Sequence, residues 1–197
     1  SREFGSGGRT IGKKVAEELG IPCYDSELIE KVASESGFDA NYIKDAGEYA
    51  PGGFLSSAFS HRSSGPNNAD YLWKIQYKII TELAEKGPCV IVGRCADYAL
   101  ADYPNVVSVF ICADEEVKIQ ELMKRHNITR DKAKDVMIKT DKQRSGYYNY
   151  YSSKRWGSSK SYNLCINSSV VGIDGAVEII KEFAKKKQEF LKINENA

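Results

Sequence analysis

The sequence predicts an α/β domain with a parallel sheet that is covered by helices on both faces. The chain has 197 residues, which is the length of one ordinary domain. Its predicted strands are continuous apolar runs, such as CVIV at 89–92 and VVSVFICA at 106–113, and helical patterns alternate with them. Strands that are apolar throughout are typical of a parallel sheet buried on both faces.

The first predicted helix begins near Arg9, because Ile11, Val15 and Leu19 recur at helical spacing and Gly20 follows as a stop. The run IPCY at 21–24 predicts a short strand. Another helix is expected over 26–36, with Asp25 or Ser26 as its N-cap. Residues 47–69 are rich in glycine and proline and show no sustained period, so we expect a long loop there.

The next helix has one apolar face and ends at Lys86–Pro88, where the apolar strand 89–92 begins. Gly93 ends this strand. The apolar face consists of Leu72, Ile75, Ile79, Ile80 and Leu83.

The last third of the chain continues the alternation. Asp114 is the expected N-cap of a helix over 115–126, and a polar helix runs from about Thr129 to beyond Lys139. A fourth strand is expected over 163–169. The final helix is expected from Gly175 to about Lys187, with a fraying tail over 185–197.

Composition excludes several function classes. The 28 Lys+Arg and 27 Asp+Glu residues give a net charge of +1, which argues against nucleic acid or an anionic membrane as a partner. No apolar run approaches the ~20 residues of a membrane span, and the first residues of the sequence do not follow the charged, apolar and cleavage-site pattern of a secretory signal, so we expect none. The five cysteines include no C-x-x-C pair, so neither a zinc site nor a disulfide framework is expected. We therefore expect a soluble cytoplasmic protein.

A glycine cluster at the start of the chain suggests a phosphate-binding loop. Glycines here allow positive φ and a close approach to an anion, and the following helix start adds partial positive charge. Against the pattern G-x-x-x-x-G-K-[ST], Arg2 takes the place of the first glycine, Gly8 that of the lysine and Arg9 that of the hydroxyl residue. The expected nucleotide-binding residues are Gly5, Ser6, Gly7, Gly8, Arg9 and Thr10.

Two further stretches carry basic residues suited to phosphate. Arg94 follows the carboxyl end of the buried strand 89–92, where ligands lie in an open α/β sheet. Residues 139–162 hold six basic residues and one acidic residue, together with five tyrosines and Trp156. They are interpreted as a lid over polyphosphate, and the alternatives are a solvated basic helix or a weak RNA-facing patch. The expected lid residues are Lys139, Asp141, Lys142 and Arg144.

The whole chain resembles the cytidylate-kinase-like family of nucleoside monophosphate kinases. The resemblance rests on residues 1–21, YDSELI at 24–29, CVIVGRCADY at 89–98, the segment 141–144 with the tyrosines after it, and YNLCINSS at 162–169. It implies one P-loop kinase-type domain over 1–197, with a monophosphate-binding insertion over 37–70 and a lid over 139–162. It also implies that a first strand belongs just before Ser1.

The resemblance further implies a reaction and its residues. The expected function is phosphoryl transfer from ATP to a nucleoside monophosphate, with a CMP-like acceptor favoured and Mg²⁺ as cofactor. Thr10 is the expected metal contact, and the acceptor is expected at Asp25, Arg94 and Asp97. Charge for catalysis would come from Arg9, Arg144, Lys154 and Arg155.

Two departures from the family pattern keep other functions open. Typical cytidylate kinases have the loop lysine where this chain has Gly8, and an aspartate after the Gly-Arg pair where it has Cys95. Asp97, two residues after Cys95, could take the place of that aspartate. The alternatives are a module that binds a nucleotide or phosphometabolite without turnover, and a kinase of another small acceptor. The sequence indicates no oligomeric state.

Overall fold

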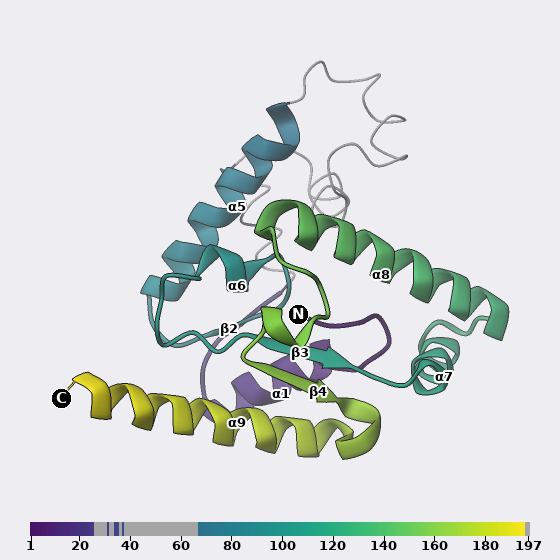
Figure 1. Cartoon of the computed structure of the whole chain (residues 1–197). Coiled ribbons are helices and arrows are strands. Elements are labelled where there is room, and N and C mark those ends of the chain that lie inside the picture. The colour runs from purple at the N-terminus through teal and green to yellow at the C-terminus, as the bar shows by residue number, and fades with distance from the viewer. Residues whose placement is uncertain (26–30, 32–33, 36, 38–66, 196–197) are drawn as a thin grey trace.

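The computed structural model describes residues 1–25, 31, 34–35, 37 and 67–195. Short parallel strands lie among helices, as the sequence predicted (Figure 1). Most of the helix expected over 26–36, the expected loop as far as residue 66, and most of the proposed insertion over 37–70 lie outside the described residues.

Two strand pairs form the described sheets, and both are parallel. β1 (Cys23–Tyr24) pairs with β2 (Val90–Ile91), with Cys23 opposite Val90. β3 (Val109–Cys112) pairs with β4 (Leu164–Asn167), with Val109 opposite Leu164. These four strands confirm the predicted ones, in shorter form.

The first residues of the chain lie along β3. Arg2 forms an isolated parallel bridge with Ile111. The Ile111 amide donates to the carbonyl of Ser1 (3.1 Å), and the Glu3 amide donates to the carbonyl of Ile111 (2.9 Å). Residues 1–3 therefore lead into the glycine loop as an extended segment beside the sheet, which is where a phosphate-binding loop is expected to start.

Successive residues of β3 join two different core clusters. Ile111 packs with Ile11 and Val15 of α1 (Gly8–Leu19) and with Ala176 and Val177 of α9 (Ser168–Glu195). Since side chains alternate along a strand, its neighbour Phe110 enters another cluster. Phe110 packs there with Cys95 and with Tyr147, Tyr148 and Tyr162.

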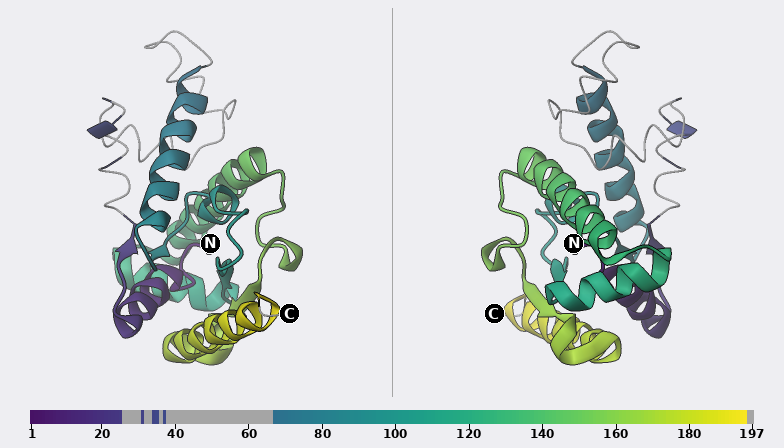
Figure 2. Two further views of the ribbon diagram at one scale, coloured as in Figure 1. Left: turned by 90° about the vertical axis from the view of Figure 1, so that its left-hand side faces the viewer. Right: turned by 90° about the vertical axis from the view of Figure 1, so that its right-hand side faces the viewer.

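Several helices pack around the short strands. Figures 1 and 2 show α9 at the bottom of the molecule and α5 (Asn67–Glu85) and α8 (Arg130–Ser152) above the strands, and α1 packs against α9. α7 (Glu115–His126) packs against α8. The short helices α6 (Ala96–Ala99) and η1 (Ser159–Ser161) complete the described elements. The P-loop type of the fold stays a prediction.

α8 runs beyond Lys139, as predicted, and ends at Ser152 inside the proposed lid segment 139–162. The prediction of a fraying tail over 185–197 was wrong, because α9 continues to Glu195. Residues 185–195 contain no glycine or proline and are rich in good helix formers, so propensity extends the helix. Asp114 stands at the expected N-cap, but its carboxylate accepts from Asn167 Nδ2 (2.9 Å) instead of capping α7.

The glycine loop is packed tightly against α7. Gly5 has φ +88°, and a Cβ added to it would lie 2.9 Å from the Lys118 carbonyl oxygen and 3.2 Å from Leu122 Cγ. Gly20 offers a matched comparison, because it has φ +64° and no atom within 4 Å of the added Cβ. Both glycines adopt a left-handed backbone that other residues rarely adopt.

We expect Gly20→Ala to lower the free energy of unfolding by about 1–2 kcal/mol, the cost of a left-handed backbone alone. Gly5→Ala should cost about 1–3 kcal/mol more, because the Lys118 carbonyl cannot move aside cheaply. Urea denaturation of the two variants measures the difference. Equal losses would contradict the tight packing of the loop against α7.

Candidate functional site

The glycine loop ends in the left-handed residue Gly7, which precedes α1. Gly7 has φ 75°, and no side chain caps the first amides of the helix. Ser6 is buried, and its hydroxyl donates to the Glu3 carbonyl (2.9 Å). Uncapped amides at a helix start beside left-handed glycines form an anion-binding concavity. The predicted nest therefore has a suitable backbone geometry.

Side chains of α7 and α8 fix the residues before the nest. The Phe4 amide donates to Asp141 Oδ1 (2.7 Å), and the Arg144 guanidinium lies over the Phe4 ring, 5.3 Å from its centroid. Lys118 of α7 binds Glu3 Oε2 at 2.8 Å, and its side chain is only 10% exposed. Asp141 of α8 therefore anchors the start of the loop through the Phe4 amide.

The backbone after β2 is strained. Gly93, Arg94 and Cys95 all have positive φ, at 80°, 58° and 52°. Such a conformation in non-glycine residues persists where the surroundings fix it, and it occurs often at ligand sites. The buried Gln76 of α5 supplies one restraint, because its Nε2 donates to the Arg94 carbonyl (3.1 Å) and to Tyr147 Oη (3.0 Å).

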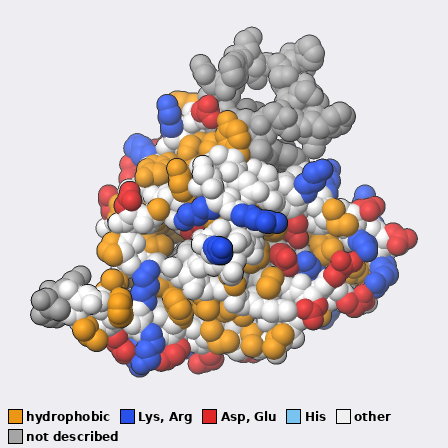
Figure 3. All heavy atoms as spheres, in the orientation of Figure 1, with side chains coloured by type: hydrophobic (Ala, Val, Ile, Leu, Met, Phe, Trp, Pro, Cys, Tyr) orange, Lys and Arg blue, Asp and Glu red, His pale blue; other side chains and the backbone are white. Residues whose placement is uncertain are grey.

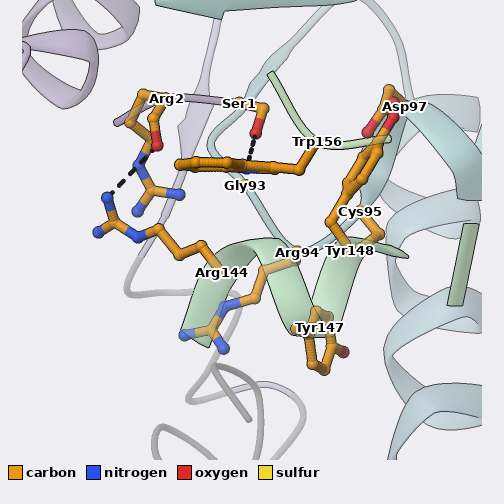
Figure 4. A pocket seen from close by; sticks show the side chains of 10 residues that line it. All are labelled: Ser1, Arg2, Gly93, Arg94, Cys95, Asp97, Arg144, Tyr147, Tyr148 and Trp156. Atoms are coloured by element: carbon orange, nitrogen blue, oxygen red, sulfur yellow. Dashed lines mark hydrogen bonds between the residues drawn. The ribbon is translucent and has the colours of Figure 1, made fainter. Parts of the chain in front are cut away.

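A pocket lies where these parts meet (Figure 4). It is lined by Ser1, Arg2, Gly93, Arg94, Cys95, Asp97, Arg144, Tyr147, Tyr148 and Trp156. Figure 4 shows three guanidinium groups, those of Arg2, Arg94 and Arg144, on one side, and Asp97 beside Tyr148 on the other. The cavity measures about 40 Å³. One water needs ~10–15 Å³ on this measure, so the space suits a phosphate-sized group.

Two polar contacts order the acidic side of the pocket. Tyr148 Oη donates to Asp97 Oδ2 (2.7 Å), and Trp156 Nε1 donates to Ser1 Oγ (3.1 Å). Burial raises the pKa of the Cys95 thiol well above its usual value, which keeps the thiol neutral. Cys95 therefore does not replace the charge of the aspartate that cytidylate kinases carry at its position.

On the basic side, one donor lacks a partner. Arg94 Nη1 is buried, and no described residue accepts a hydrogen bond from it. A buried charged donor without an acceptor is costly, and an anionic ligand would satisfy it. Arg94 therefore needs an acceptor oxygen, which a bound anion could supply.

The structure brings three predicted site residues together in the pocket: Arg94, Asp97 and Arg144. Arg9 lies outside the pocket lining and forms an ion pair with Asp25 through its Nε. Thr10 is exposed on the first turn of α1. The remaining predicted cations are also exposed and outside the lining, namely Lys139, Lys142, Lys154 and Arg155.

Basic side chains also gather on the surface beside the site. Figure 3 shows Lys and Arg side chains near the middle of the face that Figure 1 presents, close to the segment between α8 and η1. Lys154, Arg155 and Lys160 belong to that segment and to η1. The predicted lid cations at 154 and 155 are therefore solvated in this conformation.

Two residues at the site, Arg2 and Gln76, were not among the predicted site residues. In the sequence, Arg2 stands out only as a mismatch to the first glycine of the loop pattern, and Gln76 only as part of a helix. One signal in the sequence could have pointed to Arg2. The loop pattern is changed at two positions together, since an arginine replaces its first glycine and a glycine replaces its lysine. For Gln76, a single polar residue near a helix's apolar face was the signal.

The described residues offer a limited set of metal ligands. Within the described part of the chain, no group of three or more His, Cys, Asp or Glu side chains is arranged to hold a metal ion. Mg²⁺ in kinases is bound largely through substrate phosphates and waters, so a single hydroxyl such as that of Thr10 is compatible with it. Among the described helices, none has the length and apolar character that a membrane span requires.

The anchor Asp141 makes the stability of the folded chain dependent on pH. Burial raises its pKa from 3.8 to about 6, although the Phe4 amide bond acts in the opposite direction. Between these two pH values the folded chain binds more protons than the unfolded chain. The free energy of unfolding therefore falls as the pH rises through this window.

We expect Asp141→Asn to remove this decline, because the asparagine oxygen can still accept from the Phe4 amide while carrying no charge. Asp135→Asn, an exposed change on the same helix, should leave the decline as it is in the wild type. Urea titrations across pH 4 to pH 7 compare the three proteins. A wild type that gains stability relative to Asp141→Asn over this range would contradict the raised pKa.

Comparison with known proteins places the chain in a family. The model of the cytidylate kinase-like family matches residues 1–170. Among solved structures, an uncharacterized protein from Eubacterium ventriosum ATCC 27560 is similar, with 31% identity and a TM-score of 0.72 over 93% of this chain and 94% of that chain. No curated protein matches the chain. The chain belongs to the cytidylate kinase-like family.

Proposed function

We propose that this protein transfers the γ-phosphoryl group of ATP to a nucleoside monophosphate, with a CMP-like acceptor favoured. One observation carries the proposal. Arg94, whose buried Nη1 has no acceptor among the described residues, lines a phosphate-sized pocket together with Arg2 and Arg144. Family membership supports the same kind of kinase-like role.

The residues fit the physical demands of phosphoryl transfer. The reaction needs positioning of two phosphates and positive charge around the oxygens in transfer, and it needs little covalent chemistry from the protein. In the proposal, the glycine loop holds the donor phosphates and Arg94 holds the acceptor phosphate. Arg144, whose guanidinium lies over the Phe4 ring before the glycine loop, lines the same pocket as Arg94. The acceptor phosphate is already ionised, so no general base is required.

Magnesium would be held mainly by the substrates. Thr10 is the proposed protein contact, and the ion would neutralise charge on the donor phosphates. The exposed Lys139, Lys142, Lys154 and Arg155 are proposed as lid cations that approach the donor when both substrates are bound. A closed lid excludes water and so prevents hydrolysis of ATP.

The acceptor base is proposed to contact Asp97. One carboxylate oxygen, Oδ2, accepts from Tyr148 Oη, which holds the side chain in place at the edge of the pocket. A fixed carboxylate accepts hydrogen bonds from an exocyclic amino group, as cytosine and adenine carry. Asp25 is proposed as a further substrate contact, and its ion pair with Arg9 would link it to the start of α1.

A second candidate is a nucleotide- or phosphometabolite-binding module without turnover. The ion pair of Arg9 with Asp25 favours it, because this pair commits one of the cations expected to replace the missing lysine. The other alternative is a kinase of another small acceptor. Such a kinase would bind the acceptor's phosphate in the same pocket, and only the groups that contact the rest of the acceptor would differ.

The direct test is a screen of ATP and Mg²⁺ with each common nucleoside monophosphate, read by phosphorus NMR of the products. We expect formation of a nucleoside diphosphate, fastest with CMP or dCMP. Turnover with a different phosphorylated acceptor only would favour the other kinase. ATP binding by calorimetry without turnover on any acceptor would favour the binding module.

Arg94→Ala tests the proposed acceptor contact. A charge-assisted hydrogen bond contributes about 1.5–3 kcal/mol, so we expect the affinity for the best monophosphate to fall at least ~10-fold. Lys13→Ala is the control, because Lys13 is an exposed cation of α1 outside the pocket lining. Calorimetry without ATP measures both. Unchanged affinity in Arg94→Ala would remove Arg94 from the acceptor site.

A further inference from the structure

The space for a side chain at position 8 is already filled. A Cβ added to Gly8 would lie 2.5 Å from the Cβ of Arg2, 3.0 Å from its Cγ and 3.2 Å from the Cβ of Ile111. Contacts under 3.0 Å do not occur between real Cβ atoms and their neighbours, so one of the residues would have to move. The loop therefore has no room for the usual lysine while Arg2 is in place.

The same side chain reaches the other half of the site. Its stem passes Gly8, and its Nη1 occupies the space where Gly93 would carry a Cβ. The pairing of Arg2 with Ile111 in β3 fixes the start of this path, and Arg144 Nη1 donates to the Arg2 carbonyl (3.4 Å). Arg2 thus runs from the start of α1 to the turn after β2, between the proposed donor and acceptor sites (Figure 4).

We propose that Arg2 is the phosphate-binding cation that replaces the missing loop lysine, and that positions 8 and 93 are glycines because the Arg2 side chain needs their space. This inference rests on the proposed function, since it assigns a role within the same site. The guanidinium of Arg2 differs from a lysine ammonium in its charge and its geometry. A guanidinium is always charged and presents a planar fork of donors, so it can bridge oxygens of two phosphates.

The position of Arg2 suits that bridging role. Its guanidinium lies in one pocket with those of Arg94 and Arg144, and three like charges at close range favour an anionic ligand. A lysine on α1 would approach the donor from the helix start, whereas Arg2 approaches from the strand side and ends beside the turn that holds Arg94. No bond to Arg2 forms or breaks in this role.

The first test separates charge from packing with inorganic tripolyphosphate as the probe. Arg2→Met keeps an unbranched stem beside Gly8 and Gly93 but removes the charge, and Arg2→Lys keeps the charge. We expect calorimetry to show at least ~10-fold weaker binding for Arg2→Met and a loss of only a few-fold for Arg2→Lys. Melting temperatures close to the wild type would show that packing is retained.

The second test exchanges the two positions. Gly8→Lys alone should lower the melting temperature without improving binding, because its Cβ overlaps Arg2. Arg2→Gly alone should lose tripolyphosphate binding. The double variant Arg2→Gly/Gly8→Lys recreates the usual glycine and lysine of the loop pattern, so we expect it to recover binding above both single variants.

The outcomes separate this inference from the proposed function. Tripolyphosphate binding that is equally tight in Arg2→Met, or absent in the wild type, would overturn the role of Arg2. A double variant that folds but binds no better than Arg2→Gly would overturn the exchange with Gly8. Loss of binding in Arg2→Met together with no phosphoryl transfer by the wild type would retain Arg2 as a phosphate contact and reject the kinase.

Discussion

The parallel pairing of residues 1–3 with β3 is the interaction on which the site depends. Two backbone hydrogen bonds with Ile111 and the bridge to Arg2 fix where the chain enters the glycine loop. From there, Asp141 of α8 holds the Phe4 amide and Lys118 of α7 holds Glu3, so the loop is joined to two helices from distant parts of the sequence. The strand register thereby sets the position of the loop, the start of α1 and the Arg2 side chain together.

In the proposed function, this arrangement changes which element supplies charge to the phosphates. A phosphate loop with lysine carries its cation on the helix, where a flexible ammonium acts as a point charge. Here the strand carries an arginine whose stem lies against Gly8 and whose end lies against Gly93. The strained turn at Arg94, restrained by Gln76, brings a second guanidinium with a buried unpartnered donor. In this proposal, the missing loop lysine is offset by guanidinium groups that the extended segment 1–3, the turn after β2 and α8 bring to the same place.

Local signals predicted most of the fold and part of the site. The four strands follow from apolar runs, and Arg94 could be placed because it comes directly after one of them. Asp97 was proposed because it stands two residues past Cys95, where the family pattern has an aspartate. The end of α9 was mispredicted, because the helix propensity of residues 185–195 continues the helix where a fraying tail was expected. Arg2 could not be assigned, since its role depends on contacts with Gly8 and Gly93 that only the tertiary structure creates. The ion pair of Arg9 with Asp25 could not be predicted for the same reason, because only the tertiary structure brings these two residues together.

We propose that the guanidinium groups of Arg2, Arg94 and Arg144 together bind substrate phosphates. A crystal structure of the full chain with Mg²⁺, a non-hydrolysable ATP analogue and CMP would show these contacts. We expect phosphate oxygens within hydrogen-bonding distance of all three groups, with Arg94 Nη1 satisfied by the acceptor phosphate. Both nucleotides bound elsewhere, with the three guanidiniums making no phosphate contact, would contradict it.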